Sequence, residues 1–147
     1  MIIEKMFPAI ACSFTWIGFV GAISFMESWM KFRAPGISIP LGLGIGRIVF
    51  SALNKVEWTM AFIILLNILM AKSGRSPFAI YFLIPVLLLL LQTIWLLPAL
   101  DLRAQLQIDG ASIPPSNLHW YYVGMEVIKT GCLFLFGISL LSFAASA

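Results

Sequence analysis

Charged residues are scarce in this chain of 147 residues, because Asp, Glu, Lys and Arg together make up only 10% of it. Soluble globular proteins carry roughly a quarter of such residues. So small a polar fraction leaves too little hydrophilic surface to cover a water-soluble globule. The nine basic residues, which give a net charge of +3, form no dense patch, and we therefore expect no nucleic-acid partner.

Cysteine and histidine are also sparse. Cys12 and Cys132 lie in apolar stretches without C-x-x-C spacing, and we expect them to pack as small hydrophobic side chains. The single histidine, His119, cannot supply paired haem ligands from one chain or the two Glu-x-x-His pairs of a di-iron bundle. We expect His119 to cap a helix or hydrogen-bond near the membrane surface, and we predict no metal site; a metal role for His119 is the alternative. The sequence identifies no cofactor.

Hydrophobic residues, in contrast, make up 61% of the chain, and the mean hydropathy is +1.03. A helix that crosses a bilayer needs about 20 mainly apolar residues. Four stretches meet this requirement, at residues 8–28, 41–71, 77–100 and 117–143. The sequence therefore predicts an all-α integral membrane protein, a four-helix bundle that forms a single transmembrane domain over residues 1–147, with both termini on the same side.

The second and third stretches carry local irregularities. The second contains charges and is about 30 residues long, which exceeds the hydrocarbon core, so this helix should tilt, project or bend. Alternatively, residues 41–57 form a separate surface helix that turns into the membrane. Pro85 lies inside the third stretch, where we expect a kink rather than a break.

The connections between the stretches predict an orientation. A tight turn is expected at 72–75, whereas the longer loops at 29–40 and 101–117 fall together at one end of the bundle, which we name the long-loop end. Basic residues are more numerous there, because Lys31, Arg33, Arg47, Lys55 and Arg103 compare with Lys5, Lys72 and Arg75 at the other end. The positive-inside rule then places the long loops in the cytoplasm and both termini outside, as in a bacterial inner membrane.

Polar residues inside the helices gather toward the same end. A charged group at the centre of a membrane helix costs about 2.5 to 3.5 kcal/mol, so each one needs a partner or a purpose. Helical spacing puts the polar residues of 119–129 on one face and those of 47–57 on another. Together with one acid near the end of the first helix, they are predicted to line a cavity: Glu27, Arg47, Asn54, Glu57, His119, Tyr122, Glu126 and Lys129.

Two interpretations of this set stay open. In the first, the carboxylates line a site that binds a cation, relays protons or holds a polar headgroup. In the second, the charges only neutralise one another and fix the packing of the helices. The expected pairs are then Lys129 with Glu126, Arg47 with Glu57, and Lys31 with Glu27.

Three segments resemble a family of small four-helix membrane proteins that is distantly related to the copper-resistance D and membrane protoporphyrinogen-oxidase-like groups. They are KFRAPG at 31–36, GIGRIVFSALNKVEW at 44–58 and NLHWYYVGMEVIKTGCLF at 117–134. The resemblance implies a compact four-helix bundle with functional residues at Arg47, Asn54, His119 and Glu126. The haem-handling relatives use more histidines than this chain has.

Three functions are consistent with these patterns. The leading hypothesis is a small polytopic membrane protein, oligomeric, whose cavity binds or passes a small solute, ion or proton, with Glu126 and Lys129 as its central pair. The second is a non-catalytic accessory subunit that packs against other membrane subunits through Gly18, Gly42 and Gly46. The third is a membrane redox enzyme that binds a quinone or haem near His119 and Tyr122.

Overall fold

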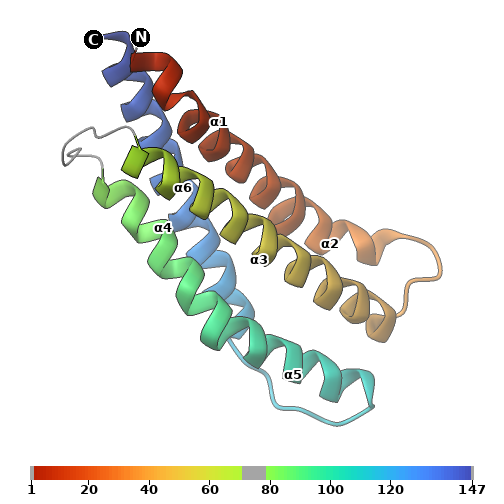
Figure 1. Ribbon diagram of the computed structural model, residues 1–147. Helices are drawn as coiled ribbons and strands as arrows, with labels where there is room; N and C mark the ends of the chain where they lie inside the picture. Colours follow the sequence, from red (N-terminus) through yellow and green to blue (C-terminus); the bar gives the residue numbers. More distant parts are fainter. Residues whose placement is uncertain (1, 71–78, 147) are drawn as a thin grey trace.

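Each of the four apolar stretches forms a long helical span, and the spans pack side by side as a bundle (Figure 1). The computed structural model describes residues 2–70 and 79–146, and these ranges contain helices, turns and loops but no β-strand. Within these ranges, four helices are long and apolar enough to cross a membrane: Lys5–Arg33, Ile39–Met70, Ile80–Ile108 and Leu118–Ala145. The predicted all-α four-helix membrane bundle is therefore confirmed.

Two of the spans are built from several helical segments. The first consists of α1 (Ile2–Val20), the π-helical turn η1 (Gly21–Glu27), α2 (Ser28–Met30) and the 3₁₀ turn η2 (Lys31–Arg33). The third consists of α4 (Ala79–Leu91), the π-helical turn η3 (Gln92–Leu96) and α5 (Leu97–Ile108). The second and fourth spans are the single helices α3 (Ile39–Met70) and α6 (Leu118–Ala145).

The observed helix bounds correct several predicted ones. The first helix begins at Ile2 rather than at residue 8, so that Pro8 lies inside it. The third span continues to Ile108, although 101–117 was expected to be a loop. Pro8 marked the predicted start of the first helix and the charge of Asp101 marked the predicted end of the third, but both helices extend past the apolar stretch. The expected turn at 72–75, the end of the second helix at 71 and the start of the third at 77 lie outside the described residues.

The second span is one uninterrupted helix of 32 residues. At 1.5 Å per residue it is about 48 Å long, which exceeds a hydrocarbon core of about 30 Å. The separate surface helix that was considered for 41–57 is therefore not formed. One end of α3 reaches the long-loop end and carries polar residues, while the rest crosses the apolar part of the bundle.

The third span changes direction where α4 meets α5 (Figure 1). Residues through Pro85 form continuous α-helix, as expected for a proline that does not break a membrane helix. The bend lies instead at η3, where the N–H of Leu97 donates to the carbonyl of Gln92, and Pro98 follows without an N–H of its own. Wide π turns and prolines are common causes of helix bends. Gln92, at the start of this turn, is buried in the bundle.

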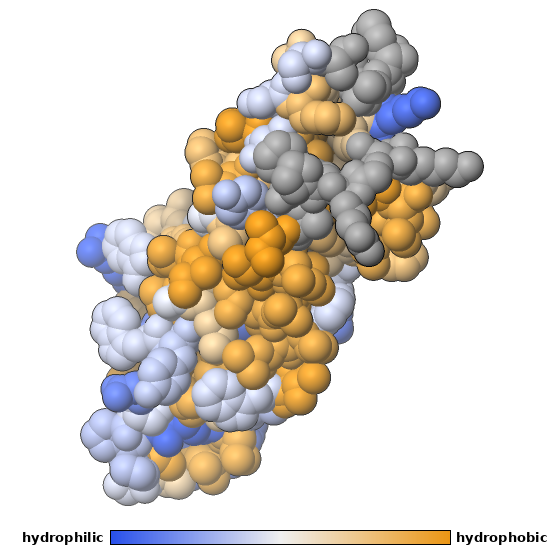
Figure 2. Space-filling model, turned by 90° about the vertical axis from the view of Figure 1, so that its left-hand side faces the viewer, coloured by the Kyte–Doolittle hydropathy of each residue, from blue (hydrophilic) through white to orange (hydrophobic). Residues whose placement is uncertain are grey.

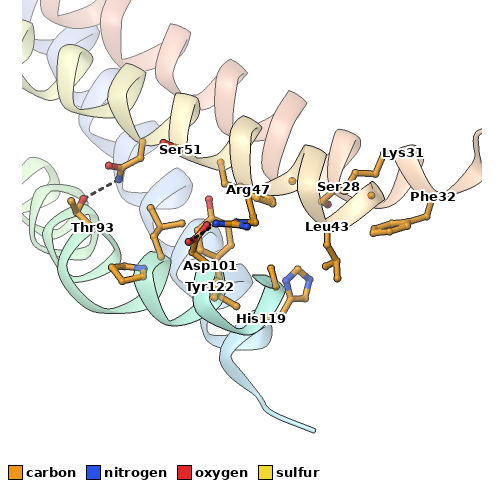
Figure 3. Close-up of a pocket in the computed structure, with 18 residues that line it drawn as sticks. Ser28, Lys31, Phe32, Leu43, Arg47, Ser51, Thr93, Asp101, His119 and Tyr122 are labelled. Atoms are coloured by element: carbon orange, nitrogen blue, oxygen red, sulfur yellow. Dashed lines mark hydrogen bonds and ion pairs between the residues drawn. The ribbon is translucent and has the colours of Figure 1, made fainter. Parts of the chain in front are cut away.

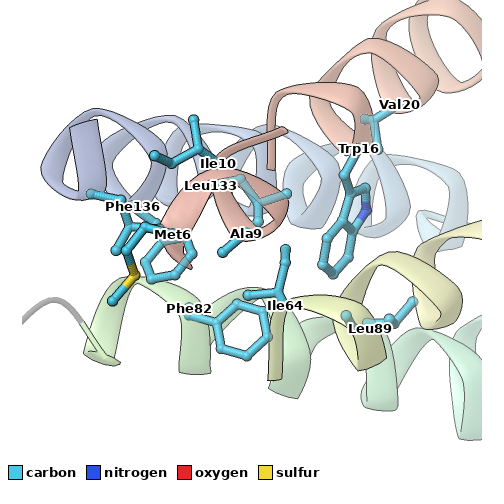
Figure 4. Close-up of a cluster of buried hydrophobic side chains, with 12 residues drawn as sticks. Met6, Ala9, Ile10, Trp16, Val20, Ile64, Phe82, Leu89, Leu133 and Phe136 are labelled. Carbon is cyan, nitrogen blue, oxygen red and sulfur yellow. The ribbon is translucent and has the colours of Figure 1, made fainter. Parts of the chain in front are cut away.

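The two termini meet at one end of the bundle, and the long connections lie at the other (Figure 1). Between the spans, toward the termini, lies a cluster of buried hydrophobic side chains that includes Met6, Ile10, Phe82, Phe136 and Leu140 (Figure 4).

Large hydrophobic side chains also cover the outside. Phe7, Phe62 and Ile94 are each more than 60% exposed. Figure 2 shows hydrophobic surface across the middle of one face. Such a surface suits lipid as its solvent.

Candidate functional site

The residues predicted to line one cavity are divided between two neighbouring sites. Glu57, Glu126 and Lys129 lie sealed inside the bundle. Arg47, Asn54, His119 and Tyr122 line a pocket at the long-loop end. Glu27 does not line this pocket, but its partner Lys31 does.

All four spans contribute to the sealed site, which we name the buried cluster. It consists of Trp16 from α1, Glu57 from α3, Gln92 from η3, and Glu126 and Lys129 from α6. Each of these side chains is at most 2% exposed. Glu126 and Lys129 share a face of α6 because they are three residues apart.

The ammonium group of Lys129 is at the centre of the buried cluster. It donates to Oε1 of Gln92 at 2.7 Å and to Oε1 of Glu126 at 2.9 Å, and it forms an ion pair with Oε1 of Glu57. These contacts use all three of its N–H groups. Lys129 therefore joins α3, η3 and α6 through charge-assisted hydrogen bonds.

Trp16 and Gln92 complete the network. Nε1 of Trp16 donates to Oε1 of Glu57 at 2.8 Å, and Nε2 of Gln92 donates to Oε1 of Glu126 at 2.8 Å. By contrast, Oε2 of Glu126 is buried and has no hydrogen-bond partner within the described part of the chain. The cluster thus contains two carboxyl groups and one ammonium group, and one of its carboxyl oxygens is fully buried without a partner among the described residues.

The pocket has a volume of about 590 Å³ and lies among η2, α3, α5 and α6 (Figure 3). Its lining is mixed, and η2, α3 and α5 each contribute both apolar and polar side chains. The apolar part includes Phe32, Leu43, Phe50, Leu97, Pro98 and Leu100. The polar part includes Lys31, Arg47, Ser51, Asn54, Thr93, Asp101, His119 and Tyr122.

Two glycines of α3 make room for side chains from the end of the first span. A Cβ added to Gly46 would lie 2.9 Å from Nζ of Lys31, and one added to Gly42 would overlap the ring of Phe32. The Lys31 ammonium group pairs with Oε2 of Glu27 at 3.3 Å and lies 5.3 Å from the centre of the Phe50 ring. The glycines thus allow a cation to be held at the pocket wall.

Arg47 connects α3 to α5 at the outer part of the pocket. Its Nε and Nη2 donate to the two carboxylate oxygens of Asp101, at 2.5 Å and 3.0 Å, and its Nη1 donates to Gln105. This two-pronged geometry fixes the orientation of the guanidinium plane. The expected pair of Arg47 with Glu57 is wrong, because ten residues of helix separate them by about 15 Å.

The other two expected ion pairs are confirmed. Lys31 pairs with Glu27 one turn away, and Lys129 pairs with Glu126 at 2.9 Å. Sequence reasoning missed Trp16, Gln92 and Asp101 as members of the two sites. The signal for Gln92 was available, since it is a lone amide within a long uncharged stretch.

The inner wall of the pocket lies one helical turn from the buried cluster. Asn54 and Tyr122 line the pocket and precede Glu57 and Glu126 by three and four residues, while Thr93 follows Gln92 directly. Nδ2 of Asn54 donates to Oγ1 of Thr93 at 2.9 Å (Figure 3).

Tyr122 also connects inward. Its hydroxyl lies 3.3 Å from Oγ of Ser24 in η1, and both side chains are buried. Hydroxyl groups both donate and accept hydrogen bonds, so either one can be the donor. Tyr122 therefore joins the pocket wall to η1 by a hydrogen bond, one helical turn before Glu126.

Within residues 2–70 and 79–146, no three His, Cys, Asp or Glu side chains come together as a set of metal ligands. Comparison with family models, curated proteins and solved structures gave no match to this chain. The geometry of the two sites is therefore the guide to function.

Proposed function

We propose that this membrane protein binds a small amphiphilic organic solute in the pocket at the long-loop end. The observation that carries the proposal is the pocket itself, about 590 Å³ in volume and lined by three of the four spans together with the end of the first. Sites for small organic ligands typically measure about 300 to 1,000 Å³ and combine apolar walls with a few placed polar groups.

The lining matches an amphiphile better than a bare ion. Leu97, Pro98 and Leu100 offer an apolar wall, while Lys31 and Tyr122 offer hydrogen-bond donors. A hydrated inorganic ion would leave the apolar wall without a partner. A quinone is one member of the solute class that this lining suits.

Binding, rather than passage through the membrane, is the activity we propose. Beyond the pocket the bundle is closed by the buried cluster, and toward the termini by the hydrophobic side chains around Phe82 and Phe136. We further propose that the pocket opens toward the cytoplasm of a bacterial cell, because the long-loop end carries the excess of Lys and Arg.

An accessory subunit is less well supported by the geometry. Gly42 and Gly46 were expected to contact other subunits, but they accommodate Phe32 and Lys31 of the same chain. Of the three glycines, only Gly18 faces open space, with no described atom within 4 Å of an added Cβ. Oligomer formation, and membership of the small four-helix family that the sequence resembles, remain part of the proposal.

The proposal is tested with a substitution that fills the pocket with a larger side chain. Ala104 lines the pocket, whereas Leu102 on the same helix is 60% exposed and does not. We expect members of a panel of quinones, fatty acids and sterols to raise the thermal unfolding temperature of the purified wild-type protein and of Leu102→Phe. Ala104→Phe should lose this response while it stays folded. If every compound acts equally on Ala104→Phe and wild type, the pocket is not the binding site.

A further inference from the structure

The buried cluster contains more negative than positive charge if all its groups are ionised. Glu57 and Glu126 face the single ammonium group of Lys129, and all three side chains are at most 2% exposed. Around them, α1 and η3 contribute only the uncharged Trp16 and Gln92. An unbalanced charge inside a membrane helix costs about 2.5 to 3.5 kcal/mol or more. One added proton makes the cluster neutral.

The hydrogen bonds indicate where that proton is held. Oε1 of Glu57 and Oε1 of Glu126 are each in contact with two N–H donor groups. A proton on either oxygen would therefore displace one of these contacts. Oε2 of Glu126 is buried without a donor among the described residues. The contacts of Glu57 within the cluster likewise all reach its Oε1, so either carboxyl group can take a proton on its Oε2 while the rest of the network stays in place.

We propose that the buried cluster is a proton-binding site, in which Glu57 and Glu126 share one exchangeable proton that enters through the pocket. The inference goes beyond solute binding, since it requires only that the pocket admits water. The cluster then resembles a buried carboxyl pair that shares a proton because two like charges so close together are not both ionised. Lys129 neutralises the carboxylate that remains.

Tyr122 provides the route. It lines the pocket, and it precedes Glu126 by one turn on the same face of α6. On uptake, the Tyr122 hydroxyl passes its proton to the carboxyl pair through water that enters from the pocket, and the phenolic oxygen takes a proton from a hydronium ion in the pocket, which becomes water. Release follows the same steps in reverse. Ser24, 3.3 Å from this hydroxyl, keeps it oriented.

Infrared spectroscopy of the purified protein, in a detergent without carbonyl groups, detects a protonated carboxyl group directly. The chain has six acidic residues, and at neutral pH the wild type should show the carbonyl stretch of one protonated carboxyl per chain. Glu126→Gln and Glu57→Gln should each lose this band, because Lys129 balances the carboxylate that is left. Lys129→Met should show two protonated carboxyl groups.

The wild-type spectrum tests the proposal even if a variant fails to fold. The absence of the protonated-carboxyl band from the wild-type spectrum would overturn the proposal. Persistence of the band in both Gln variants would overturn it too. The route is tested by deuterium exchange of the same band, which should slow in Tyr122→Phe. Tyr121→Phe is the matched control, because Tyr121 is 53% exposed. Equal exchange in the two variants contradicts the route through Tyr122.

Discussion

At the scale of single residues, Trp16 shows how a bundle in lipid accommodates a buried carboxyl group. Its indole N–H donates to Glu57 at 2.8 Å, and its side chain is fully buried between α1 and the neighbouring spans. Without water in the interior, a lost donor is not replaced. Trp16 therefore supports Glu57 by a hydrogen bond as well as by packing.

Replacement of Trp16 by Phe keeps a ring but removes the donor. We expect Trp16→Phe to lower the free energy of unfolding by about 1 to 3 kcal/mol, the range for leaving a buried hydrogen-bonding group without its partner. The matched control is Trp29→Phe, because Trp29 is 49% exposed and contacts Arg33 at the surface. Unfolding in detergent measures both variants, and equal losses would show that the indole N–H contributes nothing to stability.

The residues of the two sites could be predicted in part. The Glu126 and Lys129 pair follows from a spacing of three on one helix, and so does the Glu27 and Lys31 pair from a spacing of four. Partners on different helices could not be found this way. Glu57 pairs with Lys129, and Arg47 with Asp101, because of how α3 is rotated against its neighbours, which local periodicity does not determine.

At the scale of helical elements, close approach between spans depends on particular glycines rather than on every small residue. Gly42 faces the ring of Phe32 at the end of the first span. Gly44, two residues further along α3, points away, with no described atom within 4 Å of an added Cβ. The spacing of four residues between Gly42 and Gly46 favoured these two over Gly44 for close helix contact, but it did not show that their contacts would lie within the same chain.

This difference is measurable with a pair of single substitutions. Gly42→Ala forces the Phe32 ring out of its place, and we expect a loss of about 1 to 2 kcal/mol in unfolding free energy, as for overpacked positions. Gly44→Ala should instead be neutral or add up to about 1 kcal/mol, because alanine favours helix over glycine. The reverse order of stability would mean that Phe32 does not pack against α3.

The helix bends were also only partly predictable. Pro85 and Pro98 are both visible in the third stretch, and the sequence favoured a kink at the first of them. The bend lies before Pro98 instead, where the hydrogen bond of Leu97 spans five residues. A π turn has no sequence pattern that distinguishes it from α-helix. This one contains Gln92 of the buried cluster and Thr93 of the pocket lining.

At the scale of the whole molecule, the bundle combines an apolar exterior with polar groups collected inside. The four spans and the common side of the termini could be predicted, because span length and hydrophobicity are properties of local sequence. The division of the polar residues into a pocket and a buried cluster could not, since it depends on the bend in the third span and on the glycines of α3.

We expect the polar interior of the bundle to open to water at the long-loop end, while the outer surface of the bundle contacts lipid. Two neighbouring residues of η3 provide the most direct test. Thr93 lines the pocket, whereas Ile94 is 69% exposed on the outer surface. With Cys12 and Cys132 replaced by Ala, each is changed singly to Cys and treated with a membrane-impermeant thiol reagent in vesicles of both orientations. We predict that Thr93→Cys reacts only from the long-loop side and that Ile94→Cys reacts from neither side. Labelling of Ile94→Cys, or an inert Thr93→Cys in both orientations, would contradict the account.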